Sequence, residues 1–228
     1  MKIIELPIEY EYNGQKNHIY PSLLVLNNEL ALVDTGYPNF LPVIESEIRK
    51  SGYEMKDVKS IIVTHYDDDH IGSLYEFKEK YPGIIVIASE REAPYISGEM
   101  KSERLAQAEK MLEHMTDGEL EFGKWFIQQL KKVKHVPVDK KVNDGDMILD
   151  NTCRVIATPG HTSGHISLYF PDLKSVITGD AAVQEGQELV IANPHYCLHM
   201  EKAQQSLQKI KNLNAETYYC YHGGKLTL

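Results

Sequence analysis

Residues 64–70 read THYDDDH and place two histidines and three aspartates directly after the apolar run SIIV at residues 60–63. A metal site needs several donors held in fixed directions, and imidazole nitrogen and carboxylate oxygen both bind zinc at about 2.0 to 2.2 Å. Adjacent acids at the start of a helix also stabilise the positive end of its dipole. Such capping explains the aspartates but not the histidines, so the segment favours a metal site over a solvated turn.

Three further donors follow strand-like runs elsewhere in the chain. His161 follows RVIA in the stretch TPGHTSGH, Asp180 ends the run SVITGD, and His222 follows YYCY near the carboxyl terminus. Each of them alone also fits a turn residue, a cap or a surface side chain. Because ligands in α/β proteins gather beyond the ends of strands, the four segments together predict one shared metal centre.

The first half of the chain alternates between strands and helices. Apolar and β-branched runs predict strands, and apolar residues spaced three or four apart predict helices, with Gly52 and Pro82 as helix stops. The expected strands cover residues 2–8, 18–26, 30–34, 60–64 and 83–89, with a turn at residues 27–29, NNE; the expected helices cover residues 40–52 and a segment that carries Ile71, Leu74 and Phe77.

The second half begins with a polar helical segment at about residues 90–132, which we interpret as an inserted helical cap. The strands expected after it cover residues 133–138, 153–159, 165–170, 175–180 and 217–222, with a helix at residues 198–213. Two blocks of alternating elements predict an α/β fold in which helices cover the sheets.

Composition indicates one ordinary globular domain over residues 1–228, with 42% hydrophobic and 25% charged residues. The net charge of -9 disfavours nucleic acid as a partner, because phosphate binding relies on clustered Lys and Arg. No apolar run approaches a membrane span, so we expect a small-molecule partner and no membrane association. The amino terminus lacks the apolar core of a secretory signal and the three cysteines form no close pair, which predicts a cytoplasmic protein with reduced thiols. The oligomeric state is not predicted.

The motifs taken in order resemble those of the metallo-β-lactamase fold superfamily. They run from DTG at residues 34–36 through THYDDDHIG, TPGHTSGHISL and TGD to HGG, over nearly the whole chain. The resemblance implies a four-layered αββα sandwich with a two-metal site at one edge, between the sheets. It implies that His65, Asp67 and His161 hold a first metal, that Asp69, His70 and His222 hold a second, and that Asp180 bridges both.

The resemblance also implies a reaction. Two divalent metals, zinc first among the candidates, would lower the pKa of a shared water so that hydroxide is available near neutral pH. That hydroxide would cleave an ester, lactone, thioester or phosphoester, with Asp69 as the proton shuttle and Asp180 as the second catalytic carboxylate. Asp34 and Thr64 would orient the ligands through hydrogen bonds, although DTG also fits a simple turn.

One position departs from the family pattern. The usual motif is H-x-H-x-D-H, whereas this sequence reads H-x-D-x-D-H, with Asp67 in place of the second histidine. A carboxylate shifts metal preference from zinc toward iron or manganese. It also resembles the di-iron domain of flavodiiron proteins, which have glutamate there, so a redox protein is an alternative. A third interpretation is that Asp67 binds no metal, which leaves a weak first site or a non-catalytic relative.

The sequence disfavours some classes of substrate but does not identify one. A bridging Asp180 disfavours true β-lactamase activity. Thioesterases similar to glyoxalase II share the ligand set, but a basic carboxyl-terminal helical domain for the glutathione carboxylates is not found, and homoserine-lactone hydrolases keep the second histidine. Tyr37, Tyr196 and Trp125 are candidates for the substrate pocket. Other apolar cap residues could line it or merely pack the cap: Tyr95, Ile96, Met100, Met111, Met115, Phe122 and Phe126.

Overall fold

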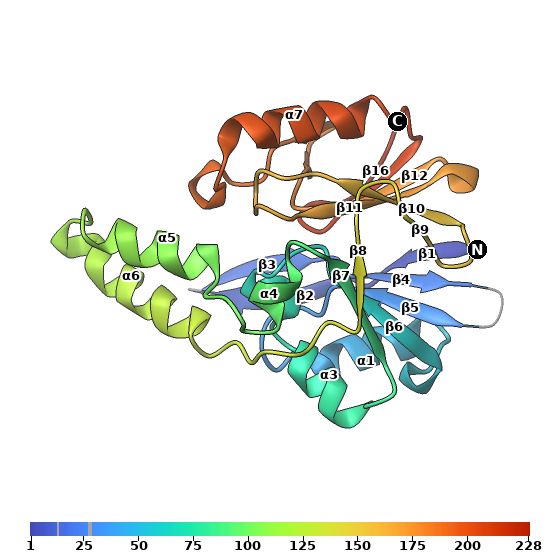
Figure 1. The fold of residues 1–228 in the computed structure, drawn as a ribbon, viewed down its shortest axis with the longest axis horizontal. Helices are drawn as coiled ribbons and strands as arrows, with labels where there is room; N and C mark the ends of the chain where they lie inside the picture. Colours follow the sequence, from blue (N-terminus) through green and yellow to red (C-terminus); the bar gives the residue numbers. More distant parts are fainter. Residues whose placement is uncertain (13, 27–28) are drawn as a thin grey trace.

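The computed structural model describes residues 1–12, 14–26 and 29–228. Two six-stranded sheets lie face to face between two layers of helices (Figure 1). The first sheet has the order β1 (Lys2–Glu5), β4 (Ser22–Val25), β5 (Leu30–Val33), β6 (Val58–Ile62), β7 (Ile85–Ser89), β8 (Lys140–Val142). The second has the order β16 (Gly224–Thr227), β15 (Thr217–Cys220), β12 (Ser175–Gly179), β11 (Ile166–Phe170), β10 (Cys153–Ala157), β9 (Met147–Ile148).

Helices cover the outer face of each sheet. Below the first sheet lie α1 (Leu41–Lys50) and α3 (Leu74–Lys80), and above the second lies α7 (Met200–Lys211) (Figure 1). The short α2 (Asp68–Ile71) and the 3₁₀ turns η1 (Met55–Asp57), η2 (Pro171–Leu173) and η3 (Pro194–Tyr196) occupy connections. The predicted α/β class and αββα layering are confirmed.

Successive residues of the central strands point to opposite sides of the first sheet. Leu32 and Ile61 belong to the core beneath the helices, whereas Val33 and Ile62 belong to the core between the two sheets. A third core lies under α7 and includes Leu207 and Ile210. Because both faces of the first sheet are buried, its strands read as continuous apolar runs rather than as alternating ones.

Strand direction gathers the connecting loops at one edge. β5, β6 and β7 pair in parallel in the first sheet, and β12 and β15 pair in parallel in the second. The carboxyl ends of parallel strands meet at the same edge of a sheet, so the segments after these strands lie near one another. These segments carry most of the predicted donors.

Residues 90–132 contain α4 (Ala93–Ile96), α5 (Glu103–Leu112) and α6 (Asp117–Leu130). The helices α5 and α6 pack on each other and project sideways from the sandwich (Figure 1). The Ser102 hydroxyl caps α5 by accepting a hydrogen bond from the Leu105 backbone N–H, at 3.0 Å. The expected helical segment is therefore present, while the assignment of the whole chain to one domain stays a prediction.

Three local predictions were wrong, and one of them is the strand expected at residues 18–26, which the structure breaks at Tyr20 and Pro21. Residues 133–138 form no strand, because Pro137 has no backbone N–H to donate. The segment makes isolated backbone hydrogen bonds instead, such as the one from the Val136 N–H to the Ile96 carbonyl at 3.1 Å. The strand expected at residues 2–8 is two strands, since the chain breaks at Pro7 and continues as the hairpin β2 (Ile8–Tyr12) and β3 (Gln15–Ile19).

The remaining features concern an additional hairpin, the predicted turn at residues 27–29, the cysteines and the hydropathy of the helices. The hairpin β13 (Val183–Glu185) and β14 (Glu188–Val190) was not expected. The turn expected at residues 27–29 falls at positions 27 and 28 outside the described residues. All three cysteines are free thiols, and no helix in the described part of the chain has the length and hydropathy to cross a membrane.

Candidate metal centre

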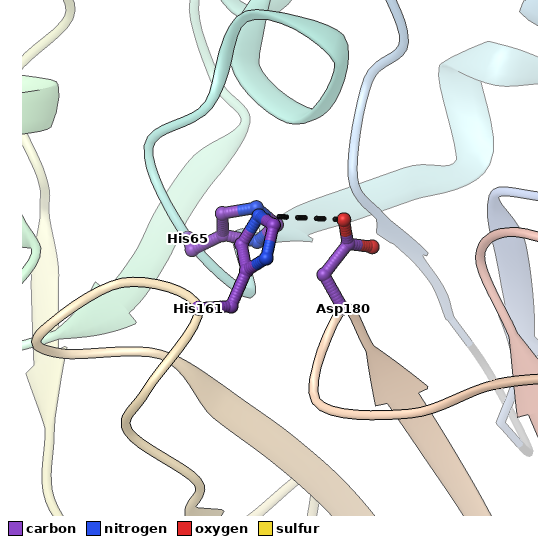
Figure 2. Close-up of side chains that lie close together, drawn as sticks. All are labelled: His65, His161 and Asp180. Atoms are coloured by element: carbon purple, nitrogen blue, oxygen red, sulfur yellow. Dashed lines mark ion pairs between the residues drawn. The ribbon is translucent and has the colours of Figure 1, made fainter. Parts of the chain in front are cut away.

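The predicted donors lie in two adjoining groups. His65, His161 and Asp180 each offer one ligand atom within 4.8 Å of the others, and they reach the same point from three different loops (Figure 2). Asp69, His70 and His222 form the second group under the same limit. The fold thus brings together residues that lie as much as 157 positions apart in the sequence, counted from His65 to His222.

Asp180 lies between the two groups. Its carboxylate is 3.5 Å from His161 Nε2 and 3.3 Å from His70 Nε2, and it is 3.6 Å from His222 Nε2. Figure 2 marks the contact with His161 by a dashed line. The resemblance implied a bridging carboxylate at this residue, and the bridging role stays a prediction.

Several of these buried atoms have no hydrogen-bond partner among the described residues. They are His65 Nε2, His70 Nε2, His161 Nδ1 and Asp180 Oδ1, and all four residues belong to the two donor groups. A buried polar atom without a partner costs about 1 to 3 kcal/mol. Cations held by the two groups would satisfy the atoms that face them, so the donor set fits divalent metals of the kind that imidazole and carboxylate ligands bind.

Asp34 and Thr64 determine which nitrogen each histidine presents. His70 Nδ1 donates to Asp34 Oδ2 at 2.9 Å, and the Thr64 hydroxyl donates to the same oxygen at 2.8 Å. Because the Thr64 proton is used in this way, His65 Nδ1 donates to Thr64 Oγ1 at 3.1 Å. Both histidines therefore carry the proton on Nδ1 and present the lone pair of Nε2 to the centre.

His165 is a supporting residue that the sequence reasoning missed. Its Nε2 accepts a hydrogen bond from the Asp180 backbone N–H at 2.9 Å, and its Nδ1 donates to Thr158 Oγ1 at 2.8 Å. Burial, together with nearby His65, lowers the pKa of His165 well below its usual value and keeps the ring neutral, as an acceptor at Nε2 must be. Its position as the second histidine of TPGHTSGH was the available signal.

The glycine before Asp180 belongs to the same arrangement. Gly179 has φ +53°, and a Cβ there would stand 2.6 Å from His165 Nε2. Only glycine combines this conformation with such a close approach of the ring. The G-D pair of the TGD motif therefore positions the carboxylate of Asp180.

Glu92, also missed, joins two ligand-bearing loops. Its fully buried carboxylate accepts hydrogen bonds from the Tyr66 backbone N–H at 2.9 Å, the Thr162 hydroxyl at 2.9 Å and the Gly164 backbone N–H at 2.7 Å. Burial raises the pKa of Glu92 to about 8, against the opposing effect of these donors. The loop of His65 and the loop of His161 are thus held together through one side chain.

Asp67, the residue that departs from the family motif, pairs with Arg104 of α5. Arg104 Nη2 lies 2.7 Å from Asp67 Oδ2, and Arg104 Nε lies 3.2 Å from both carboxylate oxygens. The same Oδ2 is 3.0 Å from His161 Nε2 and 3.5 Å from His65 Nε2. Asp67 therefore faces the first group of donors, but a buried guanidinium already contacts it. Arg104 was not among the predicted site residues.

The carboxylates of the centre favour positive charge on His70, whereas burial lowers the pKa of His65. Burial opposes ionisation of Asp67 and Asp180, but Arg104 in the first case and His222 and His70 in the second hold their pKa values well below the usual range. Burial likewise opposes protonation of His70, but Asp69, Asp34 and Asp180 outweigh it and raise the pKa of His70 well above its usual value. A site with this balance attracts a cation.

Comparison with known proteins identifies the family. The model of the metallo-beta-lactamase superfamily matches residues 18–222. The chain belongs to the metallo-β-lactamase superfamily. The predicted resemblance is confirmed, and so is the prediction of a hydrolase of this superfamily, since its named relatives include metallo-hydrolases.

Relatives of this superfamily member include proteins that are named as hydrolases. The probable metallo-hydrolase YflN of Bacillus subtilis is 29% identical over 220 residues, and the match covers 88% of this chain and 77% of that protein. A hydroxyacylglutathione hydrolase of Nitrobacter hamburgensis is 28% identical over 188 residues, and the match covers 81% of this chain and 54% of that protein. The chain spans about half the length of the hydroxyacylglutathione hydrolases that it matches.

A solved structure of the same superfamily supports the fold. The metallo-beta-lactamase family protein of Thermus thermophilus aligns with a TM-score of 0.74 at 24% sequence identity, over 99% of this chain and 74% of that protein. At this identity the likeness concerns the fold alone.

A cavity of about 490 Å³ opens above the donors of this superfamily member. Tyr37, Tyr196 and Trp125, the three residues predicted for the substrate pocket, all line it. Phe122 and Phe126 of α6 and Tyr10 of β2 add to its aromatic wall, and Asp67, Asp68, Asp69 and Asp180 lie at its base.

The remaining cap residues lie elsewhere. Tyr95 and Met100 line a separate cavity of about 340 Å³ on the other side of Arg104, and Ile96 is fully buried in the core. The described residues that line the 490 Å³ cavity do not include Met111 or Met115. The cap therefore lines the pocket with aromatic residues of α6, together with Arg104 and Gln129, rather than with these methionines.

Proposed function

We propose that this chain is a metal-dependent hydrolase that cleaves an ester, lactone, thioester or phosphoester bond of a small molecule. The observation that carries the proposal is the convergence of imidazole nitrogens and carboxylate oxygens at the base of an aromatic cavity, several of them without a hydrogen-bond partner among the described residues. Buried donors of this kind beside a cavity are typical of a catalytic centre.

Two sets of residues would hold divalent cations, with zinc as the first candidate. Asp69, His70 and His222 form one set, His65, Asp67 and His161 form the other, and Asp180 adjoins both. When bound, a divalent cation supplies Lewis acidity, which lowers the pKa of water and polarises the substrate oxygen. How many cations bind depends on Asp67, because its carboxylate also contacts Arg104.

The chain's own residues have distinct roles in the proposed reaction. Asp69 takes up the proton of the attacking water, and its Oδ2 lies 3.2 Å from Nε2 of His222, the other end of the same donor group. The Tyr221 hydroxyl donates to the Asp69 carbonyl at 2.5 Å and so holds the backbone of that residue. Asp34 and Thr64 keep the histidine lone pairs directed inward.

The cavity favours a substrate with a neutral, apolar group. Among the described residues that line it, Arg104 is the one Lys or Arg side chain, and its guanidinium contacts Asp67 and Gln107. Glutathione thioesters carry two carboxylates, which the acidic base and aromatic wall of this cavity do not match. We therefore propose a small ester, lactone or thioester with an apolar acyl group, acted on in the cytoplasm.

A substrate panel tests the proposal. The protein is freed of metal, reloaded with zinc, manganese or iron, and assayed on neutral esters, lactones, thioesters, phosphodiesters and a lactoylglutathione thioester. We expect turnover of a neutral substrate with at least one metal. Asp180→Asn and Asp69→Asn should each lower kcat/KM by at least about 100-fold, because even changes to residues behind the ligands lower activity by 10- to 100-fold.

The matched control is Asp172→Asn, since Asp172 is an exposed residue of η2. It should leave kcat/KM unchanged. Full activity in both Asp180→Asn and Asp69→Asn would contradict the proposal. Oxygen uptake that depends on a reductant, with no hydrolysis of any substrate, would favour the redox alternative instead.

A further inference from the structure

Arg104 enters the centre from the helical cap and is almost completely buried. Its side chain is 3% exposed. Nη2 and Nε bond to the Asp67 carboxylate, Nη1 donates to Gln107 Oε1 at 2.6 Å, and the ring of Tyr196 lies 5.6 Å from Cζ. Every nitrogen of the guanidinium is therefore occupied by a partner within the protein.

The guanidinium also reaches the ligand atoms of the first group. Arg104 Nη2 lies 3.3 Å from His161 Nε2, the nitrogen that faces Asp180. A guanidinium has only donors, so it directs an N–H toward a lone pair that a metal would need. It is also charged at every physiological pH, so a second cation at this position would meet a fixed positive charge.

The second group of donors has no such neighbour among the contacts that its ligand atoms make with the described residues. Its members contact one another and Asp180: Asp69 Oδ2 lies 3.2 Å from His222 Nε2 and 3.6 Å from His70 Nε2. The carboxylates of Asp69 and Asp180 together supply the negative charge that balances a dication. The two halves of the centre therefore differ in charge although their histidines are alike.

We propose that Arg104 is a built-in cation that, paired with Asp67, takes the place of a metal ion beside His65 and His161. The chain then holds a single divalent cation, at Asp69, His70, His222 and Asp180. Asp67 is explained as the partner of Arg104 rather than as a ligand that selects iron or manganese. This inference rests on the proposed metal-dependent function and specifies its metal content.

The pairing also links the cap to the centre. Arg104 lies in the first turn of α5, and Asp67 immediately precedes α2, so the ion pair connects the cap helix to the segment between His65 and α2, the helix that carries His70. A metal ion held only by the sandwich would make no such connection. Through this pair, α5 is connected to the segment that carries the donors.

The experiment counts bound zinc in the whole chain. Protein freed of metal is dialysed against a slight excess of zinc, separated from free metal and analysed for zinc per chain by elemental analysis and native mass spectrometry. We expect about one zinc per chain, because the guanidinium opposes a second dication. Two zinc ions bound with similar affinity would overturn the inference and would mean that Arg104 only orients Asp67 as a ligand.

Two variants sharpen the test. Arg104→Met keeps an unbranched apolar stem but removes the guanidinium and its charge, so it should raise the content to about two zinc ions per chain, as should the double variant D67H/R104M, which restores three histidines. Arg91→Met, at an exposed position, is the matched control and should still bind one. A content of one zinc in both folded Arg104 variants would overturn the inference.

Failure of the proposed function itself gives a different result. An unaltered, folded chain that binds no zinc, manganese or iron would contradict the metal-dependent function and this inference together. Two metals with full hydrolysis would contradict only the inference. Circular dichroism of each variant verifies folding, and the count in the unaltered chain decides the question even if a variant does not fold.

Discussion

Asp34 controls the proton positions of the histidines although it lies behind them. Its Oδ2 accepts from His70 Nδ1 and from the Thr64 hydroxyl, and its Oδ1 accepts from the Thr64 backbone N–H at 2.8 Å. Carboxylates in this position raise the basicity of the histidine ligand and fix its orientation. The DTG motif is therefore more than the end of a strand.

Replacing Asp34 by Asn tests this role. The amide keeps the shape but loses the charge and one acceptor oxygen, so zinc affinity should fall by about 10- to 100-fold with the fold intact. Isothermal titration calorimetry with zinc measures the change in Kd. Asp57→Asn, at an exposed position in η1, is the control and should bind zinc as the unaltered chain does. An unchanged zinc Kd in Asp34→Asn would remove this explanation of the motif.

At the level of elements, ion pairs position the helices that support the site. Glu45 of α1 accepts hydrogen bonds from Lys80 Nζ, at 2.7 and 3.0 Å, and from the Tyr81 hydroxyl at the end of α3. The connection matters because α3 directly follows the segment that carries Asp67 to His70. Burial raises the pKa of Glu45, but the bonds from Lys80 and Tyr81 outweigh burial and lower it overall.

A lowered pKa in the folded state gives Glu45 a defined effect on stability. The stabilisation is present above the pKa of the unfolded chain and is lost as pH falls through the pKa of the folded chain. Glu45→Gln should therefore lower the free energy of unfolding by about 1 kcal/mol at pH 7, and the difference should shrink in acid. Urea denaturation at pH 7 and at about pH 3 to 4 measures both values.

The exposed Glu54 offers a control for this measurement. Glu54→Gln should change the free energy of unfolding little at either pH, since exposed substitutions are usually within about 0.5 kcal/mol. A difference between Glu45→Gln and the unaltered chain that grows in acid would have the wrong sign for a lowered pKa and would contradict the assignment.

For the whole molecule, the centre lies where the two sheets meet. His65, Asp69 and His70 come from the first sheet's connections, whereas His161, Asp180 and His222 come from the second. A bound cation would therefore join the two halves of the sandwich. It would also stabilise the native state in proportion to its affinity, because the unfolded chain holds no preformed site.

Metal removal tests this coupling. At a free zinc concentration 100 times its Kd, binding stabilises the native state by about 2.7 kcal/mol, which corresponds to a rise in Tm of about 5 to 10 °C for a chain of this length. Calorimetry with zinc and with a chelator measures the shift. His222→Ala should reduce it, whereas His18→Ala, on β3 and away from the donors, should not. Equal Tm values with zinc and chelator would contradict the proposed site.

Local patterns were enough to predict much of this protein. A continuous apolar run such as SIIV predicts a strand that is buried on both faces, because neither face then needs polar side chains. The His and Asp residues that follow these runs can also be identified in the sequence directly. An α/β fold with covered sheets and a cluster of candidate donors could therefore be predicted from the pattern, whereas the four-layered sandwich and the full ligand set were implied by the resemblance to the metallo-β-lactamase superfamily. The segment at residues 133–138 was predicted wrongly as a strand because its valines resemble those of a buried strand. Pro137 has no backbone N–H to donate, and the segment forms no ladder of hydrogen bonds with a neighbouring strand among the described residues.

The residues behind the donors were decided by the tertiary structure. Arg104 and Asp67 form an ion pair although they lie 37 positions apart, and Glu92 accepts a hydrogen bond from Gly164, which lies 72 positions away. His165 accepts a hydrogen bond from the backbone N–H of Asp180. No short motif encodes such pairs, since a salt bridge or a buried acceptor needs only proximity in space. The sequence by itself determined which side chains can hold a metal, and only the packing of α5 against the sandwich placed a guanidinium among them, because burial there requires it to pair with Asp67.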